Sequence, residues 1–148
     1  MRKNIIFISL VIFLTNCGFS PIYVKNNNAF FSIENIDYSG DKELNDFLRI
    51  NLNQYKNENS NKKIFIKAVS EYEKIILTKD QAGKITNYKL SAKVTFLIKS
   101  TNQQISFEEE KIINTMDDKF EETRKERLEK QNFASSISNK LITELVIN

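Results

Sequence analysis

The sequence contains no histidine and no tryptophan, and its 148 residues include one cysteine, one proline and three glycines. Without histidine, neither a Ser-His nor a Cys-His catalytic pair can form, and the most common protein ligand of zinc is missing. The single cysteine, Cys17, excludes an intramolecular disulfide and a metal site built from several thiolates. We therefore expect that the protein is not an enzyme and that it carries no metal and no dissociable cofactor.

A large excess of charge of one sign is also missing. The chain has 22 Lys and Arg against 19 Asp and Glu, a formal net charge of +3, and Arg2 and Lys3 are two of the basic residues. Without these two residues the net charge falls from +3 to +1. Nucleic-acid-binding domains carry a dense basic patch, so this near-neutral composition predicts that nucleic acid is not a partner.

The most informative stretch is the N-terminal leader. Arg2 and Lys3 precede an apolar run at residues 5–14, which is interrupted by one serine. Such a run suits a secretory signal peptide and is too short to cross a bilayer, which requires about 20 apolar residues. The sequence Leu-Thr-Asn-Cys at residues 14–17 then matches the bacterial lipobox, whose cysteine thiol receives a lipid before the leader is cleaved. An ordinary signal peptide with a chance cysteine and an uncleaved anchor helix are the alternatives.

Lipidation at Cys17 would determine both attachment and location. We predict that residues 1–16 are a lipoprotein signal peptide and that Cys17, the mature N-terminus, carries diacylglycerol and an N-acyl group. Two or three acyl chains anchor a protein stably, at about 0.8 kcal/mol per buried CH₂, whereas one chain does not. An Asp after the cysteine retains lipoproteins at the inner membrane in enterobacteria-like sorting. Gly18 stands there instead, which favours the periplasmic face of the outer membrane.

Residues 17–29 are expected to form a lipidated tether, and residues 30–148 a single domain. Alternation of apolar and polar residues indicates strands, and an apolar stripe at i, i+3 and i+4 indicates helices. Asp41 is expected to cap the first helix, and a change of phase near residues 70–73 to mark a bulge or bend. The expected elements are, in chain order, a strand at residues 30–37, a helix at 42–56, strands at 63–78, 88–99 and 105–115, and a helix at 119–146.

The third expected strand has the clearest pattern, because even-numbered apolar residues from Tyr88 to Ile98 alternate with mostly polar ones. One packed and one solvated face are typical of an antiparallel sheet covered on one side. In the last helix the apolar residues lie mainly in the second half, so that half is expected to pack on the sheet. The element order predicts an α+β two-layer sandwich, β-α-β-β-β-α, with an antiparallel four-stranded sheet and two helices on one face.

The start of the predicted mature chain carries a family resemblance. Residues 17–23 are Cys-Gly-Phe-Ser-Pro-Ile-Tyr, similar to the Cys-Gly-Phe-x-Pro-Leu-Tyr that begins mature LPS-assembly lipoproteins of the LptE family. Phe19, Pro21 and Tyr23 carry this resemblance, and Ile22 replaces the more usual Leu. The resemblance implies a non-enzymatic outer-membrane lipoprotein that binds the β-barrel protein LptD. It also implies that the protein plugs the barrel, assists its folding and contacts lipopolysaccharide on its way to the cell surface.

Lysines on the polar face of the third strand are candidates for contact with lipopolysaccharide. Lys89, Lys93 and Lys99 could meet the phosphates of lipid A, where a lysine acts as a point charge. The alternative is a solvated strand face whose lysines protect the sheet from edge-to-edge pairing. Glu108 and Glu110 are expected on one face of the next strand, which we interpret as a solvated face opposite lysines of its neighbour. The alternative for such paired carboxylates is acid–base work or the binding of a divalent cation.

The first half of the last helix leaves two interpretations open. Residues 121–130 alternate in charge sign, which fits either a solvated helix surface or a polar surface that docks inside the polar lumen of a barrel. Phe120, Leu128 and Phe133 are expected to be core or staple residues, and contact with a partner is the alternative. A second functional hypothesis is an auxiliary periplasmic lipid-binding lipoprotein that serves another envelope transporter.

Overall fold

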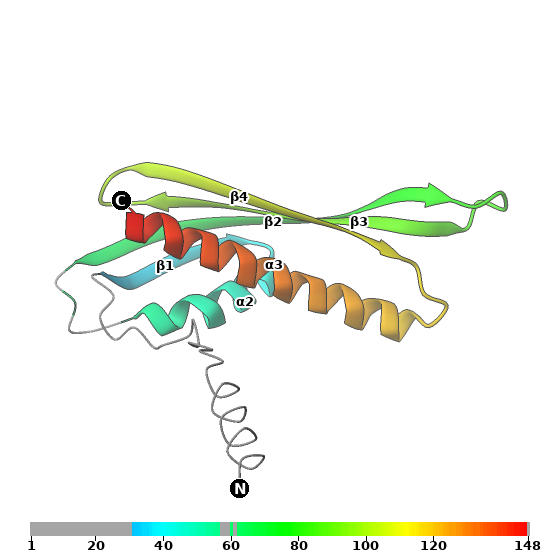
Figure 1. Cartoon of the computed structure of the whole chain (residues 1–148), viewed down its shortest axis with the longest axis horizontal. Coiled ribbons are helices and arrows are strands. Elements are labelled where there is room, and N and C mark those ends of the chain that lie inside the picture. The colour runs from blue at the N-terminus through cyan, green and yellow to red at the C-terminus, as the bar shows by residue number, and fades with distance from the viewer. Residues whose placement is uncertain (1–30, 57–59, 61, 148) are drawn as a thin grey trace, which may run out of the picture.

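The structure is a computed structural model that describes residues 31–56, 60 and 62–147. The four strands form one sheet in the order β1-β2-β3-β4, and both long helices cover the same face of it (Figure 1). The predicted α+β two-layer fold is therefore confirmed. The elements are β1 (Ser32–Gly40), α2 (Lys42–Leu52), the 3₁₀ helix η1 (Asn53–Tyr55), β2 (Lys63–Lys79), β3 (Ile85–Ile98), β4 (Gln103–Asn114) and α3 (Lys119–Ile147).

One strand pair differs from the predicted antiparallel sheet. β1 and β2 run parallel, whereas β2 with β3 and β3 with β4 are antiparallel, so the sheet is mixed. The helix between the first two strands explains the difference. α2 returns the chain to the edge where β1 began, and a crossover of this kind joins parallel neighbours, whereas short hairpin loops join the antiparallel ones.

β1 contains an irregularity that the sequence pattern did not show. Its pairing with β2 shifts register between Ile33 and Asn35. As a result Ile33 is buried in the core and Ile36, three residues later, also packs against it. The predicted alternation, which put these two isoleucines on opposite faces, is wrong because an extra residue in one strand reverses the phase.

The turn between β1 and α2 also ends the pairing of β1 with β2. The Asp41 side chain accepts a hydrogen bond of 2.7 Å from the Leu44 N–H, which confirms the predicted helix cap. The Asp41 N–H donates to the Ser70 carbonyl at 3.1 Å, and the buried Ser70 hydroxyl lies 3.2 Å from the Ser39 and Asp41 carbonyl oxygens. β1 stops opposite Ser70, so the sheet narrows to three strands beyond this residue.

The bend predicted in β2 near residues 70–73 is wrong. β2 pairs with β3 in unbroken register from Ile66 to Ile76, and shifts occur only after Ile76, on either side of Thr78. The apolar pattern fades at residue 70 because the positions facing the helices become polar, beginning with Ser70 and Lys74. The backbone stays regular while the chemistry of the covered face changes.

The apolar core lies between the helices and the wide end of the sheet. The three buried leucines of α2 and the inward side chains of β3 meet the second half of α3, as the sequence pattern predicted. Full burial of one such side chain contributes about 1.5–3 kcal/mol. The buried apolar residues of α3 all lie in its second half and are Phe133, Ala134, Ile137, Leu141 and Leu145.

Candidate functional site

The residues of the lipidation motif lie outside the part of the chain that the structure describes. This holds for Cys17, Gly18, Phe19, Pro21 and Tyr23, as it does for the predicted signal peptide and tether. The predicted roles of these residues stay predictions. The described residues do show the domain that such an anchor would hold, and its surfaces are the remaining candidate sites.

The uncovered face of the sheet carries the three candidate lysines. Lys89 forms an ion pair of 2.7 Å with Glu110 of β4, and Lys99, just after β3, forms one of 2.6 Å with Asp37 of β1. The Lys99 ammonium holds the pKa of Asp37 below its usual value, and the hydrogen bond to Glu110 raises the pKa of Lys89. Lys93 is exposed in the middle of β3. Two of the three ammonium groups therefore already have carboxylate partners.

Lys93 has acidic residues on both sides. In the register of the sheet it stands directly opposite Glu71 of β2 and Glu108 of β4. Opposite charges in such cross-strand positions stabilise a sheet modestly. Across three strands this row therefore alternates in charge. The predicted position opposite a lysine is confirmed for Glu108, whereas Glu110 stands opposite Ser91 and reaches Lys89 diagonally.

Glu109 points the other way and ties β4 to α3. Its carboxylate accepts hydrogen bonds of 2.6 Å from both the Ser136 hydroxyl and the Lys140 ammonium. Burial by itself would raise the pKa of Glu109, but the bonds from Lys140 and Ser136 outweigh it and lower the pKa. The sequence contains a signal for this contact, because the residue between two outward glutamates of a strand must face inward.

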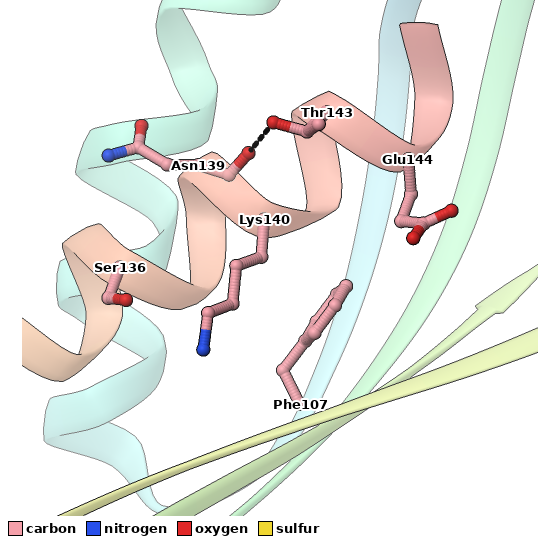
Figure 2. Close-up of a pocket in the computed structure, with 6 residues that line it drawn as sticks. All are labelled: Phe107, Ser136, Asn139, Lys140, Thr143 and Glu144. Carbon is pink, nitrogen blue, oxygen red and sulfur yellow. Dashed lines mark hydrogen bonds between the residues drawn. The ribbon is translucent and has the colours of Figure 1, made fainter. Parts of the chain in front are cut away.

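A shallow hollow of about 340 Å³ lies beside this contact, between β4 and the end of α3 (Figure 2). The ring of Phe107 forms one wall, and Lys140 and Glu144 project from the helix on either side of this ring. On the far side the Thr143 hydroxyl donates to the Asn139 carbonyl at 2.9 Å. The hollow is open and combines one aromatic surface with polar side chains of α3, of which Ser136 and Lys140 bind Glu109.

The first half of α3 meets the sheet through charged and hydroxyl groups. We call Tyr72, Lys74, Glu122, Glu126 and Lys130 the charged interface. The Lys74 ammonium lies 3.3 Å from the Glu122 carboxylate and 2.8 Å from that of Glu126, and the Tyr72 hydroxyl donates to Glu126 at 3.0 Å. Lys74 faces the helices from β2, so a cation occupies a position where the alternation of the strand predicts an apolar residue.

Lys130 connects the charged interface to the start of α2. This lysine is 8% exposed, and its ammonium lies 3.0 Å from Glu43 and 3.6 Å from Asp41. It also lies 4.0 Å from the centre of the Tyr72 ring, within the range of a cation–π interaction. The sequence signal for this arrangement is the spacing of Glu122, Glu126 and Lys130, which are four residues apart and share one side of a helix.

Glu122 is the most deeply placed carboxylate of the charged interface, at 5% exposed. It accepts bonds from the Met116 N–H at 3.1 Å and from the Lys119 ammonium at 3.2 Å, in addition to Lys74. Burial by itself would raise its pKa, but these three donors outweigh it and lower the pKa. A buried charge of this kind is tolerated only when it is paired, because desolvation of an unpaired carboxylate costs several kcal/mol.

The partners of Glu126 have shifted pKa values as well. Burial, followed by the nearby Glu126 carboxylate, raises the pKa of Tyr72. Burial would lower the pKa of Lys74, but its bonds to Glu126 and Glu122 raise it. At neutral pH Tyr72 is therefore protonated and Lys74 charged, the states in which both donate to the Glu126 carboxylate. The charged interface attaches the first half of α3 to the sheet.

Several large apolar residues lie at the surface near the charged interface. Phe120 and Leu128 are 74% and 54% exposed, so their predicted place in the core is wrong, whereas that of Phe133 is confirmed at 5%. The helical stripe that carries Phe120 and Leu128 points away from the sheet because Glu122 and Glu126 occupy the side that faces it. On the neighbouring strands, further apolar residues are exposed, namely Ile75, Ile76, Leu77 and Ile112.

The described part of the chain lacks two kinds of feature. Within residues 31–147, leaving aside the undescribed positions, no helix is long and apolar enough to cross a membrane. The same residues contain no group of three or more Cys, Asp or Glu placed to hold a metal ion.

No family model and no curated protein matches the sequence. The fold, in contrast, is similar to that of several solved bacterial lipoproteins. Rare lipoprotein B from Shewanella oneidensis superposes with a TM-score of 0.54 at 15% identity, covering 74% of this chain and 92% of that one. An uncharacterized lipoprotein B from Nitrosomonas europaea superposes with a TM-score of 0.53 at 12% identity, covering 79% of this chain and 85% of that one. A minor lipoprotein from Acinetobacter baumannii superposes with a TM-score of 0.51 at 16% identity, covering 75% of this chain and 94% of that one.

The similarity extends over most of each lipoprotein and concerns the fold. At identities of 12–16%, the similarity shows a shared chain path and gives no information on site residues. The chain therefore has the α+β architecture found in these bacterial lipoproteins. The three comparison proteins are described as lipoproteins, and their names give no substrate or partner.

Proposed function

We propose that this protein is an outer-membrane lipoprotein that partners the LptD β-barrel in the assembly of lipopolysaccharide at the cell surface. The observation that carries the proposal is the agreement of two independent features. The leader ends in a lipobox followed by the Phe19, Pro21 and Tyr23 motif of the LptE family, and the domain has the fold of solved bacterial lipoproteins. The lipid on Cys17 holds the domain at the periplasmic face of the outer membrane.

The proposed role is binding and scaffolding, without catalysis or a dissociable cofactor. In this role the exposed charges of residues 119–129 meet the polar lumen of the barrel. Polar and charged surfaces suit such a lumen, which is itself lined with polar groups. The two-layer domain acts as a plug whose shape is maintained by the apolar core.

Contact with lipopolysaccharide is assigned to the uncovered face of the sheet. Lys93 offers an exposed ammonium, and Lys89 and Lys99 exchange Glu110 and Asp37 for phosphate groups of the lipid. Such an exchange costs little because both ion pairs are solvent-exposed, and exposed pairs contribute less than about 1 kcal/mol each. The contact is electrostatic and weakens as the ionic strength rises.

The test is affinity purification of the full-length, lipidated protein from outer membranes. Recovery of a large β-barrel protein supports the proposal, and depletion of the lipoprotein is then expected to reduce lipopolysaccharide at the cell surface. A Cys17→Ser variant controls for association through the membrane, since it lacks the anchor and retains the domain. Recovery of inner-membrane transporter subunits without a barrel would overturn the proposal in favour of an auxiliary lipid-binding lipoprotein.

A further inference from the structure

α3 is attached to the sheet in two different ways along its length. In residues 119–129, all of which the structure describes, Glu122 is the only buried residue. The two apolar residues of this segment, Phe120 and Leu128, point into solvent. The second half of the helix buries apolar side chains at every turn from Phe133 onward. The same helix, whose course along the sheet is visible in Figure 1, is therefore held by charges over its first half and by apolar packing over its second half.

Both ends of the charged half are fixed to the rest of the domain. Before the helix, the Thr115 N–H donates to the Thr86 carbonyl at 2.9 Å, and the Thr115 hydroxyl lies 3.1 Å from that oxygen. At the other end Lys130 is held by Glu43 and Asp41 of the α2 region. Residues 119–129 thus lie between two anchors, and their own contacts decide whether they stay on the sheet.

The contacts of residues 119–129 hold them weakly for a long helical segment. Lys74 accounts for two of them, with Glu122 and Glu126, and Arg127 adds an exposed pair of 3.3 Å with Glu43. Removing charges from water costs free energy that their mutual attraction only partly recovers. Apolar burial has no such penalty, so the second half of α3 is held more firmly. Segments with few buried apolar contacts are the ones that open locally in native proteins.

The sheet beside this segment presents two aromatic rings, each beneath a lysine that lies outside the segment. The Tyr88 ring lies under the Lys74 ammonium, 4.3 Å from its centre, and the Tyr72 ring lies under Lys130. Residues 119–129 reach this surface through polar groups, since the Glu126 carboxylate accepts from the Tyr72 hydroxyl at 3.0 Å and from the Lys74 ammonium at 2.8 Å. The segment is therefore held on the sheet by hydrogen bonds and ion pairs, without burial of its own apolar side chains.

We propose that residues 119–129 form a clasp, a charged helical segment that opens locally from the sheet while the apolar core stays folded. The inference does not depend on the proposed partner or on lipidation. Each feature of the segment agrees with it, since its apolar residues face outward, its inner side is charged and its two ends are tethered.

Hydrogen exchange of the full-length protein in detergent micelles tests the clasp. Amides of residues 119–129 are expected to exchange at least about tenfold faster than those of residues 133–145, because they open without global unfolding. Raising the ionic strength to about 1 M, where the Debye length is about 3 Å, should increase the difference further. Equal protection in the two halves of α3, unaffected by salt, would show one rigid helix and overturn the proposal.

Variants of the central lysine separate a clasp from general instability. Lys74→Ala leaves Glu122 and Glu126 without their shared cation, so exchange of residues 119–129 is expected to rise at least about threefold while residues 133–145 are unchanged. A Lys74→Met/Glu126→Leu double variant replaces a charge pair by apolar contact and should slow exchange of the same segment. Lys140→Ala, which removes the Glu109 pair in the second half of α3, is the matched control. If Lys74→Ala accelerates both halves equally, the helix opens as one unit and the clasp is refuted.

Discussion

A Cβ atom at Gly40 would lie 1.8 Å from the carbonyl oxygen of Ser70. Gly40 also has a φ of +97°, a conformation that side-chain-bearing residues rarely adopt. The glycine is therefore required twice, by the close approach of β2 and by the backbone of the turn. This position is where the parallel pairing of β1 ends, where α2 starts and where the sheet narrows to the part covered by the charged interface.

Gly40→Ala is expected to destabilise the domain by about 3 kcal/mol, since it combines a backbone clash with an unfavourable φ. Chemical denaturation measures the change. Gly83→Ala is the matched control, because Gly83 has a similar φ of +81° but a Cβ atom there would meet nothing within 4 Å. That variant should lose only about 1 kcal/mol. Similar losses for the two variants would show that the contact with Ser70 contributes little.

Asp41 is expected to act as both a cap and a charge. Asp41→Ala removes the side-chain acceptor of the Leu44 N–H and should cost about 1 kcal/mol in the free energy of unfolding. Asp41→Asn retains the cap and removes the charge that faces Lys130 at 3.6 Å. We therefore expect Asn to recover most of the loss caused by Ala. An equally large loss for both variants would mean that the charge, and not the cap, is the important contribution.

Because the pKa of Glu122 is lowered in the folded state, we expect the domain to lose stability as the solution becomes acidic. A carboxylate whose pKa is lower in the folded state contributes stability that is present above its ordinary pKa of 4.5. This contribution is lost as the pH falls below 4.5 and through the lower folded value. Glu122→Gln should therefore be less stable than the parent at pH 7 and show a flatter loss of stability below pH 4.5. Thermal unfolding of the variant and the parent across this pH range measures the difference in stability.

Glu121→Gln provides the control for this pH effect. Glu121 is on the exposed side of the same helical turn, where it pairs with Arg124 at 3.4 Å. Its replacement should leave the acid profile of unfolding unchanged. A parallel change in both variants would point to the overall charge of the helix, whereas the structure assigns the effect to the buried Glu122 carboxylate.

The predicted lipidation gives a direct chemical test. Mass spectrometry of the mature protein should find a lipid-modified N-terminus at Cys17, and Cys17→Ser should leave the protein without a lipid. Gly18→Asp should move the lipidated protein to the inner membrane in an enterobacterial host, as membrane fractionation would detect. An unmodified Met1, or cleavage at another position, would remove the basis of the lipoprotein prediction.

Charge reversal on the uncovered face tests the assigned contact with lipopolysaccharide. The Lys89→Glu/Lys93→Glu variant should bind lipopolysaccharide at least about tenfold more weakly, a loss of about 1.4 kcal/mol. Lys42→Glu/Lys56→Glu changes the net charge equally on exposed residues of the helical layer and should leave binding unchanged. Unaltered binding in the first variant would refute the assignment, and equal weakening in both would indicate a nonspecific effect of net charge.

Sequence periodicity predicted most of the architecture because burial imposes a period of two on strands and of 3.6 on helices. The apolar side chains of β3, the second half of α3 and the Asp41 cap were all predicted in this way, since each depends on neighbouring residues in the sequence. The lipobox at Cys17 is a local motif too. Its recognition needs no fold, and the described residues leave it a prediction.

Other features of the domain depend on contacts between residues that are far apart in the sequence, and only the tertiary structure revealed them. The shift after Ile33, the inward position of Lys74 and the exposed Phe120 could not be predicted from local pattern, because each results from a partner elsewhere in the chain. Lys74 is 48 residues from Glu122 in the sequence, and a charge becomes acceptable inside a domain only when folding supplies its counter-ion. The sequence by itself thus determined most of the secondary-structure elements, and it predicts the lipid anchor. Long-range pairing decided that one half of α3 is held by charge and the other by apolar packing.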